Sequence, residues 1–139
     1  MRSVILALSL VVSMYSAQGQ EVRHRDRFGE SVVFIDGDVL RVSDRFGDAV
    51  FHYDGQTVRR EDRFGDPLYF IDGLTVRSED RFGEALFYFD GSVVRSGDRF
   101  GEPLYFIDGQ TIRAKDRFGE PIWFFETLPS KWVLVCLMM

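Results

Sequence analysis

The chain has 139 residues, of which 45% are hydrophobic and 28% charged, and its formal net charge at pH 7 is −5. This length and composition suit one folded domain and exclude a disordered protein. The acidic balance argues against binding to nucleic acid or to an anionic membrane.

The first predicted element is a secretory signal over residues 1–19. Arg2 supplies a positive start, residues 4–12 form an apolar run too short to span a bilayer, and residues 17–19 (Ala-Gln-Gly) resemble a cleavage site. Removal after Gly19 leaves a net charge of −5 − 1 = −6. We therefore expect a secreted, periplasmic or cell-surface protein.

Six copies of Asp-Arg-Phe-Gly follow, each eighteen residues after the one before. They begin at Asp26, Asp44, Asp62, Asp80, Asp98 and Asp116. If repeat positions are counted from this Asp, positions seven to ten are apolar or aromatic except for His52, and eleven and twelve are Asp-Gly in five copies. Position fifteen is aliphatic and position sixteen is Arg. A fixed period indicates one small structural unit used repeatedly.

The residues of each unit predict a β-hairpin. Asp-Gly between two β-rich runs favours a two-residue type I′ turn. Arg-Phe-Gly followed by Glu or Asp makes a second, longer turn, so two strands of about six residues and the two turns together fill the eighteen-residue period. No helical period occurs within the unit.

The predicted domain is bounded by half units. The signal is 1–19, the β-hairpin repeat domain is 20–127, and an apolar tail is 128–139; within the domain a half unit covers 20–25, full units cover 26–43, 44–61, 62–79, 80–97 and 98–115, and a half unit covers 116–127. These boundaries predict about twelve strands.

Two arrangements of the strands are open, an antiparallel meander and a parallel β-solenoid with 18-residue coils. A solenoid stacks identical positions about 4.8 Å apart and places Arg on Arg, which is destabilising, so we favour the meander. A sheet of twelve strands is expected to curl, to fold into two layers or to close as a barrel. Dimerisation is the other way to cover its apolar face.

The alternation of side chains predicts which residues face water. Positions eight, ten and fifteen share one apolar face, whereas seven, nine, fourteen and sixteen share an amphipathic face. The second face is the candidate binding surface, because aromatic rings stack on sugars and Arg pairs with carboxylates. Its candidate residues are Arg41, Arg59, Arg77, Arg95, Arg113, Phe34, Phe70, Tyr88 and Phe106. The alternative is that these Arg side chains only bridge Asp or Glu on neighbouring strands.

The tail, residues 128–139, breaks the repeat. We expect it to pack over the last strand, which would otherwise be an exposed hydrophobic edge. A segment for partner binding or sorting is the alternative.

No catalytic constellation emerges. His24 and His52 lie in different units and Cys136 is the lone cysteine, so neither a catalytic triad nor a zinc site can be assembled. We expect no enzyme activity and no cofactor. Carboxylates at positions one, five and eleven leave calcium binding as a weaker hypothesis.

The Tyr-Phe-Ile-Asp-Gly core at residues 69–73 resembles tandem β-hairpin repeats of the MORN type. The resemblance implies an elongated meander with a scaffold or interaction role.

These observations predict an exported, non-catalytic repeat protein that acts as a binding or envelope scaffold module. Its expected partner is a protein or a polysaccharide, and it is not expected to span a membrane. The alternative is a purely structural protein that self-associates into homo-oligomers through its sheet.

Overall fold

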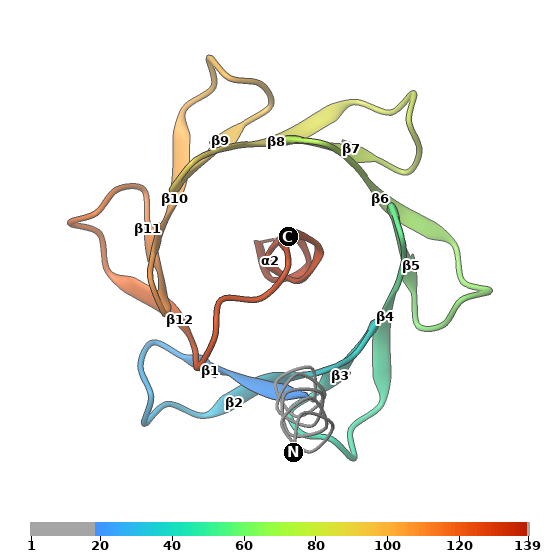
Figure 1. Ribbon diagram of the computed structural model, residues 1–139, viewed down its shortest axis with the longest axis vertical. Helices are drawn as coiled ribbons and strands as arrows, with labels where there is room; N and C mark the ends of the chain where they lie inside the picture. The colour runs from blue at the N-terminus through green and yellow to red at the C-terminus, as the bar shows by residue number, and fades with distance from the viewer. Residues whose placement is uncertain (1–18, 139) are drawn as a thin grey trace, which may run out of the picture.

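The computed structural model describes residues 19–138, so the predicted signal lies, apart from Gly19, outside the described part of the chain. Twelve antiparallel strands form a closed barrel with one helix inside it (Figure 1). The strands are β1 (Gln20–His24), β2 (Ser31–Asp36), β3 (Val39–Val42), β4 (Ala49–Asp54), β5 (Thr57–Arg60), β6 (Pro67–Asp72), β7 (Thr75–Ser78), β8 (Ala85–Asp90), β9 (Val93–Ser96), β10 (Pro103–Asp108), β11 (Thr111–Ala114) and β12 (Pro121–Phe125), and the helix is α2 (Lys131–Met138). The predicted all-β meander is confirmed in its barrel form, and every strand pair is antiparallel, which rules out the parallel solenoid.

Each hairpin turn lies one residue later than the sequence predicts. In the third unit Asp72 pairs with Thr75, so the two loop residues are Gly73 and Leu74, not Asp72 and Gly73. Gly73 has a φ of 63° and Leu74 has no positive φ, as in a type II′ turn that needs glycine only at its first central position. The Asp is therefore the last residue of the strand, where its carboxylate is available to a neighbouring side chain.

The predicted division into two faces nevertheless holds. Moving the turn by one residue changes each residue's cross-strand partner by two, so the same side chains still share a face. Position fifteen faces the interior and is fully buried in all six cases: Val22, Leu40, Val58, Val76, Val94 and Ile112. Residues at positions eight and ten pack against them, as Tyr69 and Ile71 do in the third unit. A β-bulge follows position fifteen, for example between Val76 and Arg77. It changes the register in which this strand pairs with the first strand of the next unit.

The barrel closes because the two half units complete each other. Val22 pairs with Phe125 and Arg23 with Phe124, which are the repeat positions that pair within every complete hairpin. β1 and β12 thus form a sixth hairpin without a turn. Side-chain hydrogen bonds tie its open end, since Gln20 Nε2 donates to the Thr127 carbonyl oxygen at 2.7 Å.

The C-terminal tail fills the barrel and does not cover an edge. α2 lies in the lumen (Figure 1), and its buried residues are Trp132, Val133, Leu134, Val135, Cys136 and Met138. A helix that is apolar all round is typical of a buried core element. The expectation that the tail protects the edge of the last strand is wrong, because β12 is already paired on both sides by β1 and β11.

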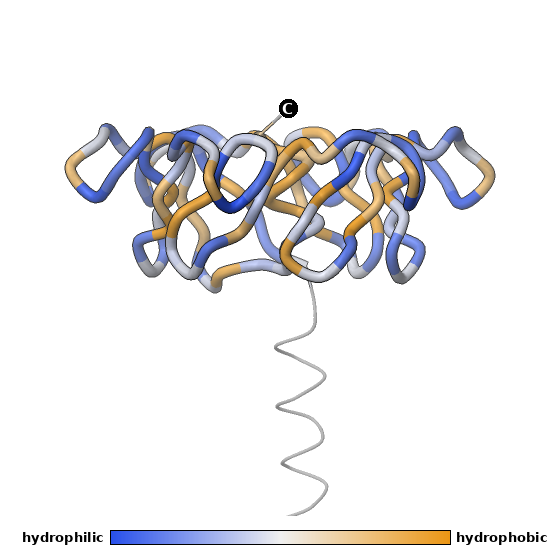
Figure 2. Tube along the Cα trace, turned by 90° about the horizontal axis from the view of Figure 1, so that it is seen from above, coloured by the Kyte–Doolittle hydropathy of each residue, from blue (hydrophilic) through white to orange (hydrophobic). Residues whose placement is uncertain are grey.

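The two ends of the barrel differ. The Asp-Gly turns form one rim, and the Asp-Arg-Phe-Gly loops spread sideways from the other (Figure 2). We call each of these six loops a spoke. No helix within residues 19–138 is long and apolar enough to cross a membrane.

Candidate functional site

The candidate binding residues lie on the outer wall and form cross-strand pairs. In each complete hairpin the residue at position nine stands opposite the Arg at position sixteen. The pairs are Phe34–Arg41, His52–Arg59, Phe70–Arg77, Tyr88–Arg95 and Phe106–Arg113. The structure therefore brings all nine predicted residues onto one surface in which each Arg has an aromatic ring or His52 beside it.

The position-sixteen arginines are held in place by two contacts each. The guanidinium approaches the strand-ending Asp of its own hairpin, with Arg–Asp nitrogen–oxygen distances of 3.0 to 3.5 Å. It also donates from Nη1 to the carbonyl oxygen of the next spoke's glycine at 3.1 to 3.3 Å. The Arg59 Nε is buried and lies 3.5 Å from Asp54 Oδ2 without making a hydrogen bond. These arginines thus anchor the spokes to the wall, as the alternative interpretation of the sequence predicted in part.

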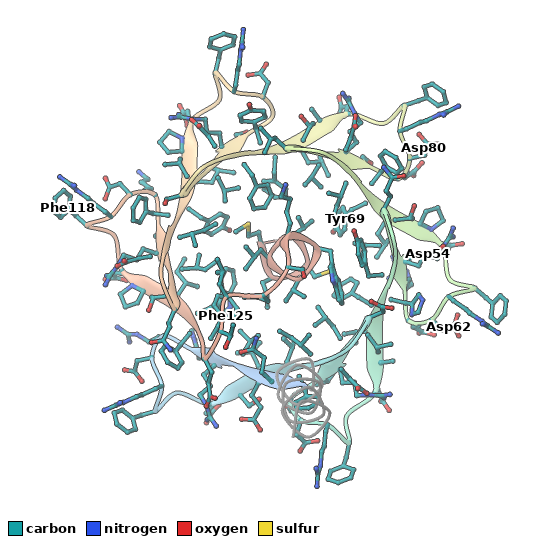
Figure 3. All side chains as sticks on the ribbon, viewed as in Figure 1. Asp54, Asp62, Tyr69, Asp80, Phe118 and Phe125 are labelled. Carbon is teal, nitrogen blue, oxygen red and sulfur yellow. The ribbon has the colours of Figure 1, made fainter. Side chains whose placement is uncertain are left out.

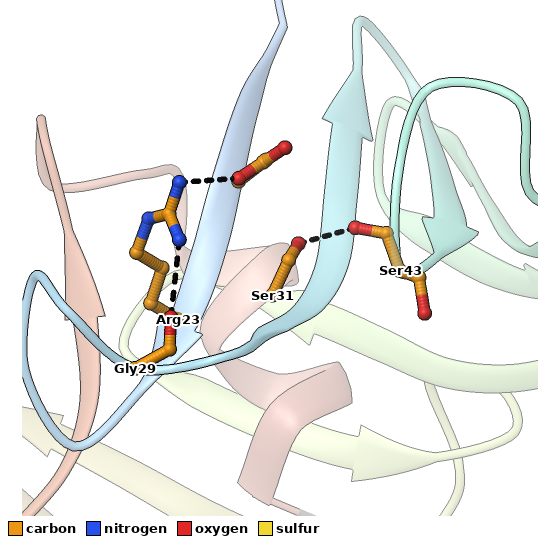
Figure 4. A network of polar contacts seen from close by, with 5 residues as sticks. Arg23, Gly29, Ser31 and Ser43 are labelled. Carbon is orange, nitrogen blue, oxygen red and sulfur yellow. Dashed lines mark hydrogen bonds and ion pairs between the residues drawn. The ribbon is translucent and has the colours of Figure 1, made fainter.

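Arg23 reproduces this anchor at the seam of the barrel. Its Nη1 donates to the Gly29 carbonyl oxygen at 3.0 Å, and its Nη2 contacts Glu21 Oε2 at 2.7 Å (Figure 4). The Ser31 hydroxyl donates to the Ser43 carbonyl oxygen in the same region (Figure 4). The closing strand pair therefore keeps the Arg-to-spoke hydrogen bond of the other hairpins, with Glu21 in place of the strand-ending Asp.

Local hydrogen bonds set the shape of each spoke. The first Asp accepts a hydrogen bond on Oδ1 from the Phe amide two residues later at 2.9 Å in all six copies. The spoke glycine packs against the carbonyl of the preceding strand, so a Cβ at Gly83 would overlap the Ser78 oxygen. The residue before each spoke has a positive φ, and it is glycine only at Gly97. The prediction that the second, longer turn of each unit lies at Asp-Arg-Phe-Gly is confirmed by this geometry.

The spoke phenylalanines do not pack into the barrel. They are 81–83% exposed, as Phe118 shows at the periphery of Figure 3. The neighbouring Arg of each spoke lies over its ring, with the guanidinium carbon 4.8–4.9 Å from the centroid. Sequence reasoning missed these exposed rings, although their position outside the strands was a signal.

A groove forms where a spoke overhangs the outer wall of the repeat before it. One groove of about 310 Å³ has Phe106 and Arg95 on the wall side and Asp116, Arg117 and Phe118 on the spoke side. A second, of about 480 Å³, combines Phe34 with Asp44, Arg45 and Phe46. Position nine and the following Asp-Arg-Phe define both grooves, so the surface recurs at two places around the ring.

The remaining candidates do not converge on a reaction centre or a metal. Within residues 19–138, no three side chains among His, Cys, Asp and Glu gather as a metal site requires. Asp at position eleven ends a strand at the turn rim, whereas positions one and five belong to the spokes at the other rim. His52 lies on the outer wall opposite Arg59.

The ionisable groups of the lumen are shifted by burial. Desolvation raises the pKa of the Cys136 thiol far above its ordinary value. It also raises the pKa of the Tyr69 and Tyr105 phenols above 10.0. A thiol held in its protonated form is a poor nucleophile, so these groups form part of the core.

The fold defines a closed twelve-stranded β-barrel built from tandem hairpin repeats around a central helix. A family model described as Suprabasin, GxHH repeat, matches residues 9–132, and the chain belongs to this family. Its only histidines are His24 and His52, so the paired histidines in that description do not occur here. No curated protein and no solved structure matches the chain.

The resemblance to MORN repeats is wrong, since the family match points elsewhere. An aromatic strand followed by Asp-Gly, as at residues 69–73, is a general device for making a hairpin and carries little information about family. The meander is also closed and not elongated.

Proposed function

We propose that the protein is an exported, non-catalytic binding module that holds a polysaccharide in the grooves beneath its spokes, as part of an envelope or extracellular scaffold. The observation that carries the proposal is that a wall Phe and the Asp-Arg-Phe of the next spoke line a groove at two separate places around the barrel. A ligand made of repeating units suits a surface made of repeating sites, because several weak contacts act together.

The groove at Phe106 has the chemistry that a sugar ring requires. The phenyl rings of Phe106 and Phe118 offer apolar faces for stacking on a pyranose. The Asp116 carboxylate and the guanidinium groups of Arg95 and Arg117 offer acceptors and donors to hydroxyl or carboxylate groups. The ligand does not have to order Arg95, since this side chain is already held by hydrogen bonds to Asp90 and to the Gly101 carbonyl oxygen.

Affinity electrophoresis against neutral and acidic polysaccharides tests the proposal. We expect at least one polysaccharide to retard the protein. Replacing the wall aromatics together (Phe34→Ala, Phe70→Ala, Tyr88→Ala and Phe106→Ala) should weaken that retardation at least tenfold, at about 0.5 kcal/mol or more per lost stacking contact. These residues are better targets than the position-sixteen arginines, whose loss would also release the spokes.

Leu74→Ala is the matched control, because Leu74 is 51% exposed in a turn at the opposite rim. It should leave the retardation unchanged. Failure of every polysaccharide to retard the protein, or equal retardation of the four-residue variant with unchanged circular dichroism, would overturn the proposal.

A further inference from the structure

The spokes carry a large exposed apolar surface that the fold does not use. Six phenylalanine rings, each more than four-fifths exposed, are arranged around one rim. They point away from the barrel axis and form its lateral periphery (Figure 3). Scattered exposed apolar residues need no explanation, but six equivalent aromatic tips form a regular pattern that indicates a contact surface.

Each spoke also carries charges of both signs. Its arginine lies over the ring of its own phenylalanine, as Arg81 lies over Phe82. Among residues 19–138, no carboxylate comes within ion-pair distance of the spoke arginines. Position five of the same spoke is Glu or Asp, such as Glu84, and it makes no side-chain ion pair within the described chain.

A spoke is therefore complementary to a second spoke in the opposite orientation. The arginine of one can reach the position-five carboxylate of the other, and the reverse pair forms at the same time, while the two phenyl rings stack between them. Such a contact is two-fold symmetric and uses the same residues on both sides.

The other surfaces available for self-association are already occupied. Every strand from β1 to β12 has a partner on both sides, so the described chain has no open sheet edge. The apolar inner face is covered by α2. Self-association through a sheet face or edge, as the sequence suggested, would require the barrel to open.

We propose that the spokes bind the spokes of further copies of this chain, so that barrels assemble side by side in a layer perpendicular to the barrel axis. The spokes radiate in several directions around one rim (Figure 1), so one copy can contact several neighbours. A single pair of exposed spokes is weak, and assembly depends on the number engaged at once. The inference goes beyond the proposed function, because it does not require a polysaccharide, even though spoke residues such as Arg117 and Phe118 also line a groove.

Charge reversal with complementation tests this contact on the full mature chain, by sedimentation velocity over a wide range of concentrations. One variant replaces the six spoke arginines (Arg27, Arg45, Arg63, Arg81, Arg99 and Arg117) with Glu. The other replaces the position-five acids (Glu30, Asp48, Asp66, Glu84, Glu102 and Glu120) with Lys. We expect the unmodified protein to form larger species as its concentration rises, each variant alone to remain monomeric, and an equimolar mixture to associate again.

Circular dichroism of each variant checks that the barrel is intact, and six Phe→Ser substitutions in the spokes provide a second route if a charge variant does not fold. An unmodified protein that stays monomeric at all concentrations overturns the proposal. So does association that persists in both charge variants. If the protein is monomeric and the Phe→Ser variant loses polysaccharide retardation, the spokes serve the ligand and not a second copy, which overturns self-association while supporting the proposed function.

Discussion

Arg23 lies opposite Phe124 across the strand pair that closes the barrel, as Arg41 lies opposite Phe34 within the first complete hairpin. The two pairs occupy the same repeat positions, although the first joins residues near the two ends of the described chain. The seam is therefore built from the same contacts as the rest of the wall.

A disulfide across this seam should stabilise the barrel more than a disulfide within a hairpin. In a Cys136→Ala background, Arg23→Cys with Phe124→Cys closes a loop of about 100 residues, for which chain entropy predicts about 4.7 kcal/mol of stabilisation. The matched pair Phe34→Cys with Arg41→Cys closes a loop of about 8 residues, for which the same relation gives about 2.5 kcal/mol. Urea denaturation under oxidising and reducing conditions measures both values. Failure of the seam pair to oxidise while the hairpin pair oxidises would contradict closure.

The helix in the lumen should be essential for stability. Trp132 is 4% exposed and stacks on Tyr53 with ring centroids 5.1 Å apart. Trp132→Ala leaves a large cavity between helix and wall, and we expect a loss of about 3–5 kcal/mol in the free energy of unfolding. The control is Leu128→Ala, because Leu128 is 45% exposed and its replacement should change stability by less than about 0.5 kcal/mol. Equal urea midpoints for the two variants would show that α2 is not part of the core.

Two classes of glycine should respond differently to alanine. Gly73 needs a positive φ but has open space around its Cα, so Gly73→Ala should cost about 1 kcal/mol of backbone strain. Gly83 lies against the Ser78 carbonyl, so Gly83→Ala must displace backbone and should cost about 3 kcal/mol. Thermal or urea unfolding of the two variants measures the difference. A smaller loss for Gly83→Ala would mean that the spoke can move away from the strand.

Alkaline pH should destabilise the barrel through the tyrosines that face its lumen. Burial raises the pKa of Tyr105 and Tyr69 above the ordinary value of 10.0, so the unfolded chain releases these protons first. The stability that the neutral phenols contribute is complete below about pH 10 and is lost as pH rises through their higher folded pKa values. Urea midpoints between pH 8 and pH 11 should fall less steeply for Tyr105→Phe than for the unmodified protein.

Tyr88→Phe provides the comparison for the alkaline series, since Tyr88 lies on the outer wall opposite Arg95. Its pH profile should follow that of the unmodified protein. If both Tyr→Phe variants change the profile to the same extent, the alkaline transition does not arise in the lumen.

The candidate surface was only partly predictable. The pairing of position nine with Arg at sixteen follows from alternation along a hairpin, so the nine candidate residues could be placed on one face in advance. The anchoring of each Arg by the strand-ending Asp depends on the turn lying one residue later than Asp-Gly chemistry suggests, as between Asp72 and Thr75. The position of Phe118 outside the strands was a signal of exposure, but only the tertiary structure shows that its loop turns the ring away from the barrel wall.

The eighteen-residue period determined by itself that the protein is a chain of hairpins with one apolar and one amphipathic face, because turn preference and strand alternation act over neighbouring residues. Only the tertiary structure decided that the meander closes, with Val22 beside Phe125, and that the tail enters the lumen as α2. Closure depends on the twist accumulated over twelve strands, and the width of the resulting lumen determines what must fill it. Neither the accumulated twist nor the width of the lumen can be predicted from a pattern of neighbouring residues.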